Sequence, residues 1–263
     1  VGAVLLVDVT TGSHLSLNSA FGYSPTGNAR LYGISNYSYG QVAAAACLVA
    51  ALVAAWVPTR RGRWVAMGLL LVVLVVLGVP VWGSDVGGVL AFTPAIGAFA
   101  LLLYGLRVRG RTVVLAGLAT AAVITLFGFL DLSRPPTERA HLGRLFERIG
   151  REGLEPLLSV IERKLLANLR VSTGSAWVLA IPIAVGFWVF LARHRTRGLA
   201  RVAARIPTLH AGLAAAAVAA VLGSLLNDSG AIIGGVVLTV VAVALAFLAL
   251  DPAPAVAPGE EQA

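Results

Sequence analysis

Long apolar runs alternate with short polar segments along most of the chain. Seven of the runs are close to the twenty or so residues that a helix needs to cross a bilayer. These runs cover 37–57, 64–82, 87–106, 112–130, 175–192, 209–226 and 231–250. The pattern therefore predicts an all-α fold: one polytopic membrane helix bundle over residues 1–250, with seven full transmembrane helices.

The first residues form a shorter apolar run. Val1 to Val7 is too short to span a bilayer and ends at Asp8. It has no basic leader and no small-residue cleavage site, so it does not match a signal peptide. We expect this stub to be the end of a membrane helix that begins upstream, and the sequence to be the C-terminal part of a larger protein.

One long polar segment, 131–174, interrupts the apolar runs. It carries eight of the 20 Lys and Arg residues and six of the 12 Asp and Glu residues. Its leucines recur at helical spacing in two stretches, one following Thr137 and one following Gly153, with Pro156 in the first turn of the second. The spacing predicts two amphipathic helices that form a cap on the membrane surface or on top of the bundle, the first capped by Thr137. The apolar positions are Leu142, Leu145, Phe146 and Ile149 in the first helix, and Leu154, Leu157, Leu158, Ile161, Leu165 and Leu169 in the second.

Composition supports a membrane protein and gives it an orientation. The chain is 58% hydrophobic and 12% charged, with a mean hydropathy of +0.88, whereas a soluble domain is about one quarter charged. The net charge of +8 is concentrated in three alternate loops, which is typical of membrane topology and argues against nucleic acid as a partner. These loops contain eleven arginines and no acidic residue: Arg60, Arg61, Arg63, Arg107, Arg109, Arg111, Arg193, Arg195, Arg197, Arg201 and Arg205.

The positive-inside rule places these basic loops in the cytoplasm of a multi-pass plasma-membrane protein. The acidic, Pro-rich tail 251–263 is then cytoplasmic as well, and its composition predicts disorder. The loop 8–36, the turns 83–86 and 227–230 and the cap 131–174 lie on the extracytoplasmic side. The five tryptophans, Trp56, Trp64, Trp82, Trp177 and Trp188, all fall near predicted span ends, where amphipathic rings prefer the headgroup level.

Polar residues cluster at the extracytoplasmic ends of several spans, and they predict a shared site there. The planar guanidinium group of arginine binds phosphate and carboxylate through two hydrogen bonds, and aspartates can orient a substrate or act as acid or base. The candidate catalytic residues are Asp85 and Asp228. The candidate substrate-binding residues are Arg30, Tyr32, Asn36, Arg134, His141, Arg144, Lys164, Asn168, Asn227 and Ser229.

Each of these residues also has a purely structural interpretation. Asp85 and Asp228 stand beside glycine in short turns, where Asp and Asn are common turn formers. The cap arginines also suit a solvated face or an anchor to anionic headgroups, and His141 suits a surface position. Convergence of several clusters at one membrane face favours a site, and Gly87-Gly88 with Pro94 predicts a locally opened helix beside it.

Familiar catalytic and metal-binding signatures are absent from the sequence. It contains no P-loop, no His-Glu-x-x-His, no Cys-x-x-Cys and no nucleophile elbow. A metal held by Asp85, His141 and Asp228 is conceivable, but no spacing among them supports it. We therefore expect no metal and no cofactor, and membrane lipids as partners.

Short motifs at the polar clusters resemble those of a family of uncharacterised bacterial polytopic membrane proteins, frequent in actinobacteria. The motifs are Gly-Tyr-Ser-Pro at 22–25, Arg-x-Tyr-Gly-Ile-x-Asn at 30–36, Asp-x-Gly-Gly at 85–88, His-Leu-Gly-Arg at 141–144 and Asn-Asp-Ser-Gly at 227–230. Some relatives carry an extracytoplasmic alkaline-phosphatase-like domain ahead of the membrane part. Ser35 stands where the family pattern has glycine, and Tyr37 where relatives often have an acid. The resemblance implies a topology and a candidate site and no established reaction.

Three functions are consistent with the sequence. The first is an envelope protein that binds or processes an anionic, phosphate-bearing or lipid-linked substrate at its outer face. The second is a transporter of a small solute, which would need ionisable groups at mid-membrane depth, where the spans have few. The third is a non-catalytic membrane anchor or scaffold for a domain that precedes Val1. Whether the protein is an enzyme stays open at this stage.

Overall fold

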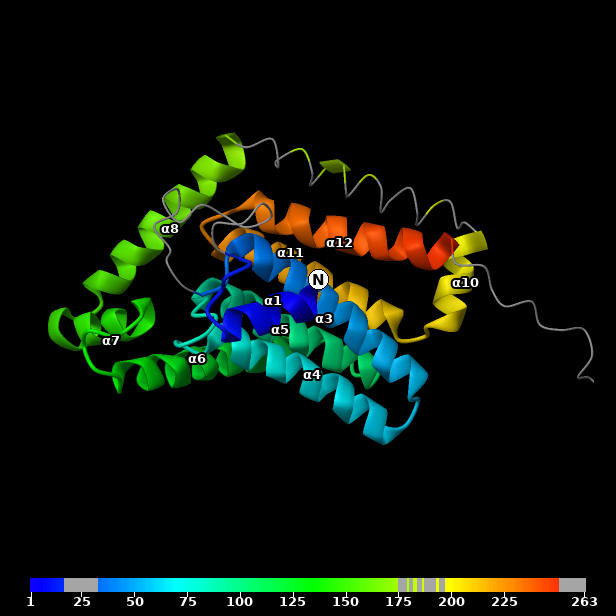
Figure 1. Cartoon of the computed structure of the whole chain (residues 1–263), viewed down its shortest axis with the longest axis horizontal. Coiled ribbons are helices and arrows are strands. Elements are labelled where there is room, and N and C mark those ends of the chain that lie inside the picture. The colour runs from blue at the N-terminus through cyan, green and yellow to red at the C-terminus, as the bar shows by residue number, and fades with distance from the viewer. Residues whose placement is uncertain are drawn as a thin grey trace, which may run out of the picture.

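The computed structural model describes residues 1–16, 33–174 and 197–250, together with single positions between 175 and 196. Within these residues the regular structure is entirely helical (Figure 1). Six helices in the described part of the chain are long and apolar enough to cross a membrane, and the protein is therefore a polytopic helical membrane protein. The helices are α1 (Gly2–Thr10), α3 (Asn36–Trp56), α4 (Arg60–Gly78), α5 (Val86–Leu103), α6 (Gly110–Leu132), α7 (His141–Glu152), α8 (Glu155–Gly174), α10 (Arg197–Arg205), α11 (Leu209–Leu226) and α12 (Ala231–Leu250).

The six long helices correspond to six of the seven predicted spans, and the predicted span 175–192 lies largely outside the described residues. Helix α4 begins four residues before its apolar run, because the Thr59 hydroxyl accepts the amide of Gly62 and caps it. The N-terminal helix α1 continues past the predicted boundary to Thr10. Asp8 is buried in it and accepts the backbone amides of Leu15 and Ser16 at 2.7 and 2.9 Å.

The prediction of a helix opened at Pro94 is wrong. Helix α5 runs without interruption from Val86 to Leu103, with Pro94 inside it. A proline lacks one amide donor, and neighbouring helices in a membrane bundle can accommodate that loss without unwinding. The polar residues near α5 are therefore presented by its N-terminal end and not by a break in its middle.

Small side chains allow the central helices to approach closely. Helix α3 is the most buried of the six candidate spans. It packs against α11 and α12 at the centre of the bundle, and α11 also packs against α5 and α12. A Cβ on Gly212 would lie 2.7 Å from the carbonyl oxygen of Cys47 and 2.8 Å from Cβ of Ala51. Ala43, Ala44 and Ala215 are fully buried in the same region. Close packing through small residues therefore holds the centre together.

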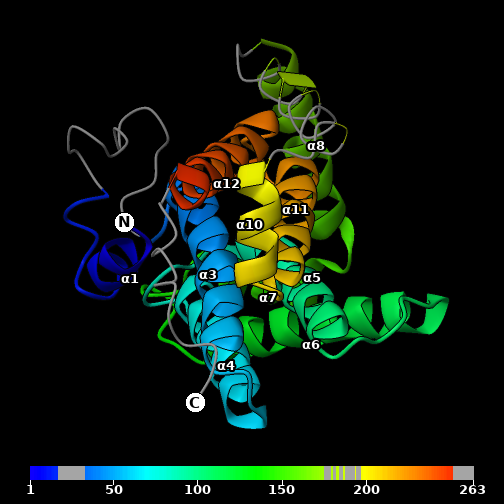
Figure 2. The ribbon, with the colours of Figure 1, turned by 90° about the vertical axis from the view of Figure 1, so that its right-hand side faces the viewer.

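Helix α6 lies at the edge of the bundle, beside α5 (Figure 2). Only 17% of its apolar window is buried, against 67% for α3. Near its C-terminal end α6 contacts α4, where the ring of Phe127 fills the space over Gly78. The C-terminal end of α6 is therefore the part that the bundle fixes in place.

The described parts of the basic loops lie at the end of the bundle opposite the cap. The guanidinium of Arg63 lies 5.8 Å from the ring centre of Tyr104, which brings the α3–α4 and α5–α6 loops together. Helix α10 lies against the C-terminal end of α12, where Gly198 meets Ala249. Figure 1 shows α10 and the α3–α4 connection at the right-hand end, and α7 and α8 at the left-hand end.

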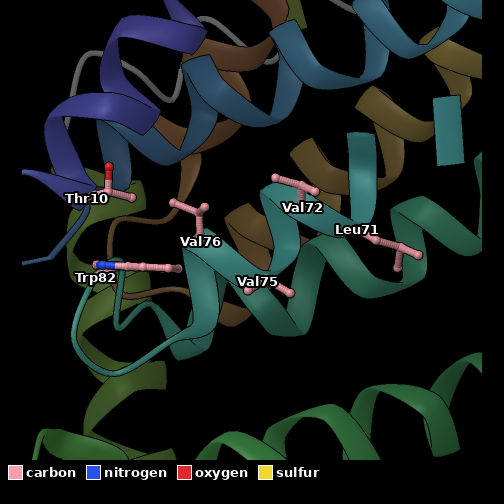
Figure 3. Close-up of a pocket in the computed structure, with 6 residues that line it drawn as sticks. All are labelled: Thr10, Leu71, Val72, Val75, Val76 and Trp82. Carbon is pink, nitrogen blue, oxygen red and sulfur yellow. The ribbon is translucent and has the colours of Figure 1, made fainter. Parts of the chain in front are cut away.

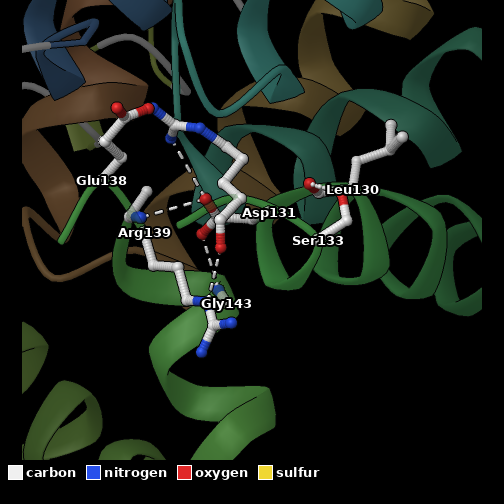
Figure 4. Close-up of polar contacts among 8 residues, drawn as sticks. Leu130, Asp131, Ser133, Glu138, Arg139 and Gly143 are labelled. Atoms are coloured by element: carbon white, nitrogen blue, oxygen red, sulfur yellow. Dashed lines mark hydrogen bonds and ion pairs between the residues drawn. The ribbon is translucent and has the colours of Figure 1, made fainter. Parts of the chain in front are cut away.

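A buried aspartate joins the cap to the bundle. Asp131, fully buried in the last turn of α6, accepts the backbone amides of Ala140 at 3.0 Å and Gly143 at 2.7 Å (Figure 4). These amides belong to the start of α7, so Asp131 caps α7 from the preceding helix. The predicted cap, Thr137, does not serve this purpose, because α7 begins only at His141. Gly143 is required there, since its Cβ would lie 2.8 Å from the Asp131 carboxylate.

Candidate functional site

A pocket of about 830 Å³ lies between the end of the bundle and the two cap helices. Its walls come from the N-terminal ends of α3 and α5, the turn between α11 and α12, and one face each of α7 and α8. Eight of the predicted site residues line it: Asn36, Asp85, His141, Arg144, Lys164, Asn227, Asp228 and Ser229. Antiparallel helices bring these residues together, because the start of α3, the start of α5 and the end of α11 all meet at the same end of the bundle.

The floor of the pocket is polar and buried. Asp85 and Asn227 are each 2% exposed, and Tyr39 lies fully buried close to Asp85. Asp85 occupies the N-cap position of α5, yet its carboxylate makes no capping hydrogen bond. Its carboxylate instead lies over the backbone of Gly88, since a Cβ there would come within 2.4 Å of one of its oxygens.

The wall formed by the cap is cationic. Arg144 and Arg148 reach the pocket from α7, and Arg163 and Lys164 reach it from α8. Arg148 pairs with Glu152 at 3.0 Å and Lys164 with Asp228 at 3.4 Å. Among the described residues, Arg144 and Arg163 form no ion pair with a carboxylate. With four cationic side chains against the two carboxylates of Asp85 and Asp228, the pocket has an excess of positive charge.

Asp228 connects the cap to the bundle across the pocket. Its carboxylate accepts the side-chain amide of Asn36 at 2.8 Å and pairs with Lys164 on the other side. The Asn36 amide also donates to the hydroxyl of Ser229. Asp228 is about half exposed, so it is open to the pocket while these partners hold it in place. It can orient a ligand or exchange a proton with one.

Two predicted site residues lie outside the lining of the pocket. Arg134 pairs with Asp131 at 3.3 Å and with Glu138 at 3.6 Å, which places it in the α6–α7 connection. Asn168 donates its amide to the carbonyl oxygens of Ser224 and Asn227, the latter at 2.6 Å, and so secures α8 to the end of α11. Arg30 and Tyr32 lie outside the described residues.

Sequence reasoning missed Arg163 and Tyr39. Arg163 stands opposite the leucine stripe of α8 and next to Lys164, so the helical periodicity of 154–169 contains a signal for it. Tyr39 stands near a predicted span end, where an aromatic ring is typical of the membrane interface. Its full burial beside Asp85 follows from the packing of α3 against α5 and α11, which no local pattern specifies.

A second cavity, of about 350 Å³, is a shallow groove on the outer side of α4 (Figure 3). Leu71, Val72, Val75, Val76 and Trp82 line it, with Thr10 of α1 above them. It presents no charged side chain, and Leu71, Val72 and Val75 are exposed, whereas Val76 is buried. This surface has the character of a lipid-facing flank, and the polar pocket is the candidate site.

Within the described residues, no group of three or more His, Cys, Asp or Glu side chains is arranged to hold a metal ion. Asp85, His141 and Asp228 all line the pocket, but they do not form such a group.

The fold and the pocket together define the class: a multi-span helical membrane protein with a polar, cation-rich pocket beneath a two-helix cap. No family model matches the chain, and neither a curated protein nor a solved structure resembles it significantly.

Proposed function

We propose that this protein binds an anionic, phosphate-bearing ligand in the pocket under the cap, on the extracytoplasmic side of a bacterial envelope membrane. The observation that carries the proposal is the pair Arg144 and Arg163, which project into one pocket from two helices without a carboxylate partner in the described residues. Two guanidinium forks around a single cavity suit a phosphate, which accepts bidentate hydrogen bonds.

The orientation follows from the basic loops. They lie at the end of the bundle opposite the pocket, and positive charge is retained on the cytoplasmic side. The pocket then faces away from the cytoplasm. Its lining also includes Leu142, Leu145, Val160, Val171 and Ile232, so it can accept the first part of an acyl or prenyl chain as well as a soluble ester.

The aspartates have distinct roles in this proposal. Asp228, half exposed and held by Asn36 and Lys164, is placed to orient the ligand or to exchange a proton with it. Asp85, buried at the floor, is placed to accept a hydrogen bond from the ligand. Binding is the core of the proposal, and transfer or hydrolysis would build on it.

A transporter is less well supported. Coupled transport commonly uses ionisable groups at mid-membrane depth. In the part of the chain that the structure describes, the buried carboxylates are Asp8, Asp85 and Asp131, and all three lie at or near helix ends. The buried charge is thus concentrated at the membrane boundary, where it suits surface binding.

The test is ligand binding by purified protein in nanodiscs of phosphatidylcholine. Glycerol phosphate should bind and raise the melting temperature. The double variant Arg144→Gln/Arg163→Gln should weaken binding by about tenfold or more, because the loss of the two charge-assisted contacts together exceeds about 1.4 kcal/mol. The matched control is Arg151→Gln/Arg170→Gln. It removes the same charge one heptad further along the same two helices, at residues that do not line the pocket.

Two further arms decide the source of the phosphate. Phosphatidic acid in the nanodisc should displace glycerol phosphate if the ligand is a lipid, and should leave its binding unchanged if the pocket accepts only soluble esters. If the two double variants weaken ligand binding equally, the loss is caused by the change in net charge and not by the pocket, which would contradict the proposal. Failure of the unmodified protein to bind either form of phosphate would also overturn it.

A further inference from the structure

The floor of the pocket holds polar groups that the cationic wall does not account for. Tyr39 from α3, Asp85 before α5 and Asn227 after α11 meet there, each at most 2% exposed. Within the described residues, the hydroxyl of Tyr39 and the Nδ2 of Asn227 have no hydrogen-bond partner. Buried polar atoms are nearly always paired, because leaving one unpaired costs its full desolvation. Of the two, Asn227 lines the pocket and Tyr39 does not, so Nδ2 of Asn227 is the atom that points to a group that the pocket receives.

The amide of Asn227 is held in one orientation. Its Oδ1 accepts the backbone amide of Asp228 at 2.8 Å, and its own carbonyl oxygen accepts from Asn168 at 2.6 Å. With Oδ1 engaged, Nδ2 is the donor left over, and Asn227 lines the pocket. A fixed donor at a pocket floor is a preorganised contact that a ligand does not need to order on binding.

A pair of glycines makes room for this cluster. A Cβ at Gly87 would lie 2.7 Å from Nδ2 of Asn227, and a Cβ at Gly88 would lie 2.4 Å from a carboxylate oxygen of Asp85 and 2.8 Å from the ring of Tyr39. A larger residue at Gly87 would displace Asn227, and one at Gly88 would displace Asp85 and Tyr39. The floor is thus a specific arrangement of three helices and not a chance cavity.

The chemistry of the floor differs from that of the wall. The floor offers an amide donor from Asn227 and a carboxylate acceptor from Asp85, and a carboxylate has several acceptor positions. A hydroxyl group both donates and accepts, so it matches this combination. A second phosphate does not match, because the Asp85 carboxylate would repel it.

We infer that the floor binds a hydroxyl group of the same ligand whose phosphate is held by Arg144 and Arg163, so that the ligand class is a phosphate ester of a polyol, soluble or carried on a lipid. This inference rests on the proposed function. It assigns Asn227 and Asp85 to ligand contact. Tyr39 lies outside the pocket lining, with its ring close to Gly88.

Two ligands that differ only in hydroxyl groups test the inference. Glycerol phosphate and propyl phosphate have the same carbon skeleton and the same phosphate. Titration calorimetry on the unmodified protein in phosphatidylcholine nanodiscs should give glycerol phosphate an affinity about tenfold or more above that of propyl phosphate, because the unsubstituted chain leaves the buried polar atoms unpaired. Both ligands are compared on the unmodified protein, so no misfolded variant can account for a difference in affinity.

The variant Asn227→Asp localises the effect. It keeps an oxygen to accept the amide of Asp228, removes the Nδ2 donor and adds a negative charge. The added charge acts on the phosphate of both esters alike, so the readout is the ratio of the two affinities, which should fall towards one. By contrast, Arg144→Gln/Arg163→Gln should weaken both ligands by the same factor.

The outcomes separate the two proposals. If both esters bind the unmodified protein equally, the hydroxyl subsite is wrong and the phosphate pocket stands. If Asn227→Asp weakens both esters equally, Asn227 supports the pocket and does not contact the hydroxyl, which also overturns the inference. If neither ester binds, the proposed function fails and the subsite fails with it.

Discussion

The two helices of the cap are both amphipathic, but they present opposite faces to the bundle. Helix α7 turns its apolar side inward: Leu142 is buried, and the ring of Phe146 covers Gly128 and meets Phe129 edge-on at 5.7 Å between ring centres. Helix α8 turns its polar side inward, so that Ser159, Arg163 and Lys164 line the pocket. In its apolar stripe Leu157 is half-buried, whereas the rest of the stripe and the preceding Leu154 are 46–65% exposed: Leu154, Leu158, Ile161, Leu165 and Leu169.

The difference shows that an amphipathic pattern predicts a helix without predicting which face meets the protein. Helix α7 follows directly from the end of α6, whose apolar surface and buried Asp131 receive it. Helix α8 lies over the end of α11 and the turn that follows it, where the last backbone carbonyls of the helix have no partner within the helix. The favourable contacts there are hydrogen bonds from Asn168 and the ion pair between Lys164 and Asp228. Apolar packing together with the Asp131 cap therefore fixes α7, and polar contacts position α8.

The largest expected effect is loss of the α6–α7 junction. Asp131→Ala leaves the amides of Ala140 and Gly143 buried without their acceptor, at a cost of roughly 1–3 kcal/mol for each donor. Thermal unfolding in detergent should show a clearly lower melting temperature, and limited proteolysis should cut faster between 133 and 140. The control Glu138→Gln removes an exposed partner of Arg134 and should change little. Equal melting temperatures for the two variants would show that Asp131 does not hold the cap.

An intermediate loss of stability is expected from a substitution in the apolar stripe of α7, and a much smaller loss from one in the apolar stripe of α8. Phe146→Ala removes a half-buried ring from its contact with α6 and should destabilise by about 2 kcal/mol, below the roughly 3–5 kcal/mol typical of a fully buried ring. Leu165→Ala removes a side chain that is 59% exposed and should change stability by less than about 0.5 kcal/mol. The same unfolding assay measures both. A loss at Leu165 as large as that at Phe146 would mean that the α8 stripe is packed as tightly as that of α7.

The smallest effect should be local to α8. Asn168→Ala removes the donor that satisfies the last carbonyls of α11 and should cost about 1 kcal/mol. Hydrogen exchange should become faster in the second half of α8 while α7 stays protected. Arg170→Gln, an exposed change two residues away, is the matched control. Faster exchange in α7 of the same size would show that the two cap helices move as one unit and would remove the distinction drawn between them.

The sequence by itself determined the helical class, the positions of the six described spans and the clustering of polar groups at one end of the bundle. Hydropathy is sufficient for the spans, because a bilayer admits an isolated apolar segment only as a helix of fixed length. Alternation of short loops then places the start of α3, the start of α5 and the end of α11 on one side. Asn36, Asp85 and Asn227 could therefore be grouped from the sequence, although they are far apart in it.

Only the tertiary structure decided how those groups are used. From the local sequence, Thr137 is the expected N-cap of α7, but Asp131 caps the helix instead. Its carboxylate, buried at the end of α6, lies within reach of the amides of Ala140 and Gly143. The orientation of α8 about its own axis decides which of its residues face the bundle. It directs Asn168 to the end of α11, where it holds α8 in place, and it directs Arg163 into the pocket. The closeness of Tyr39, Asp85 and Asn227 depends on three helices that meet over two glycines. Contacts of this kind are set by distances between distant segments, and a pattern within one segment contains no information about them.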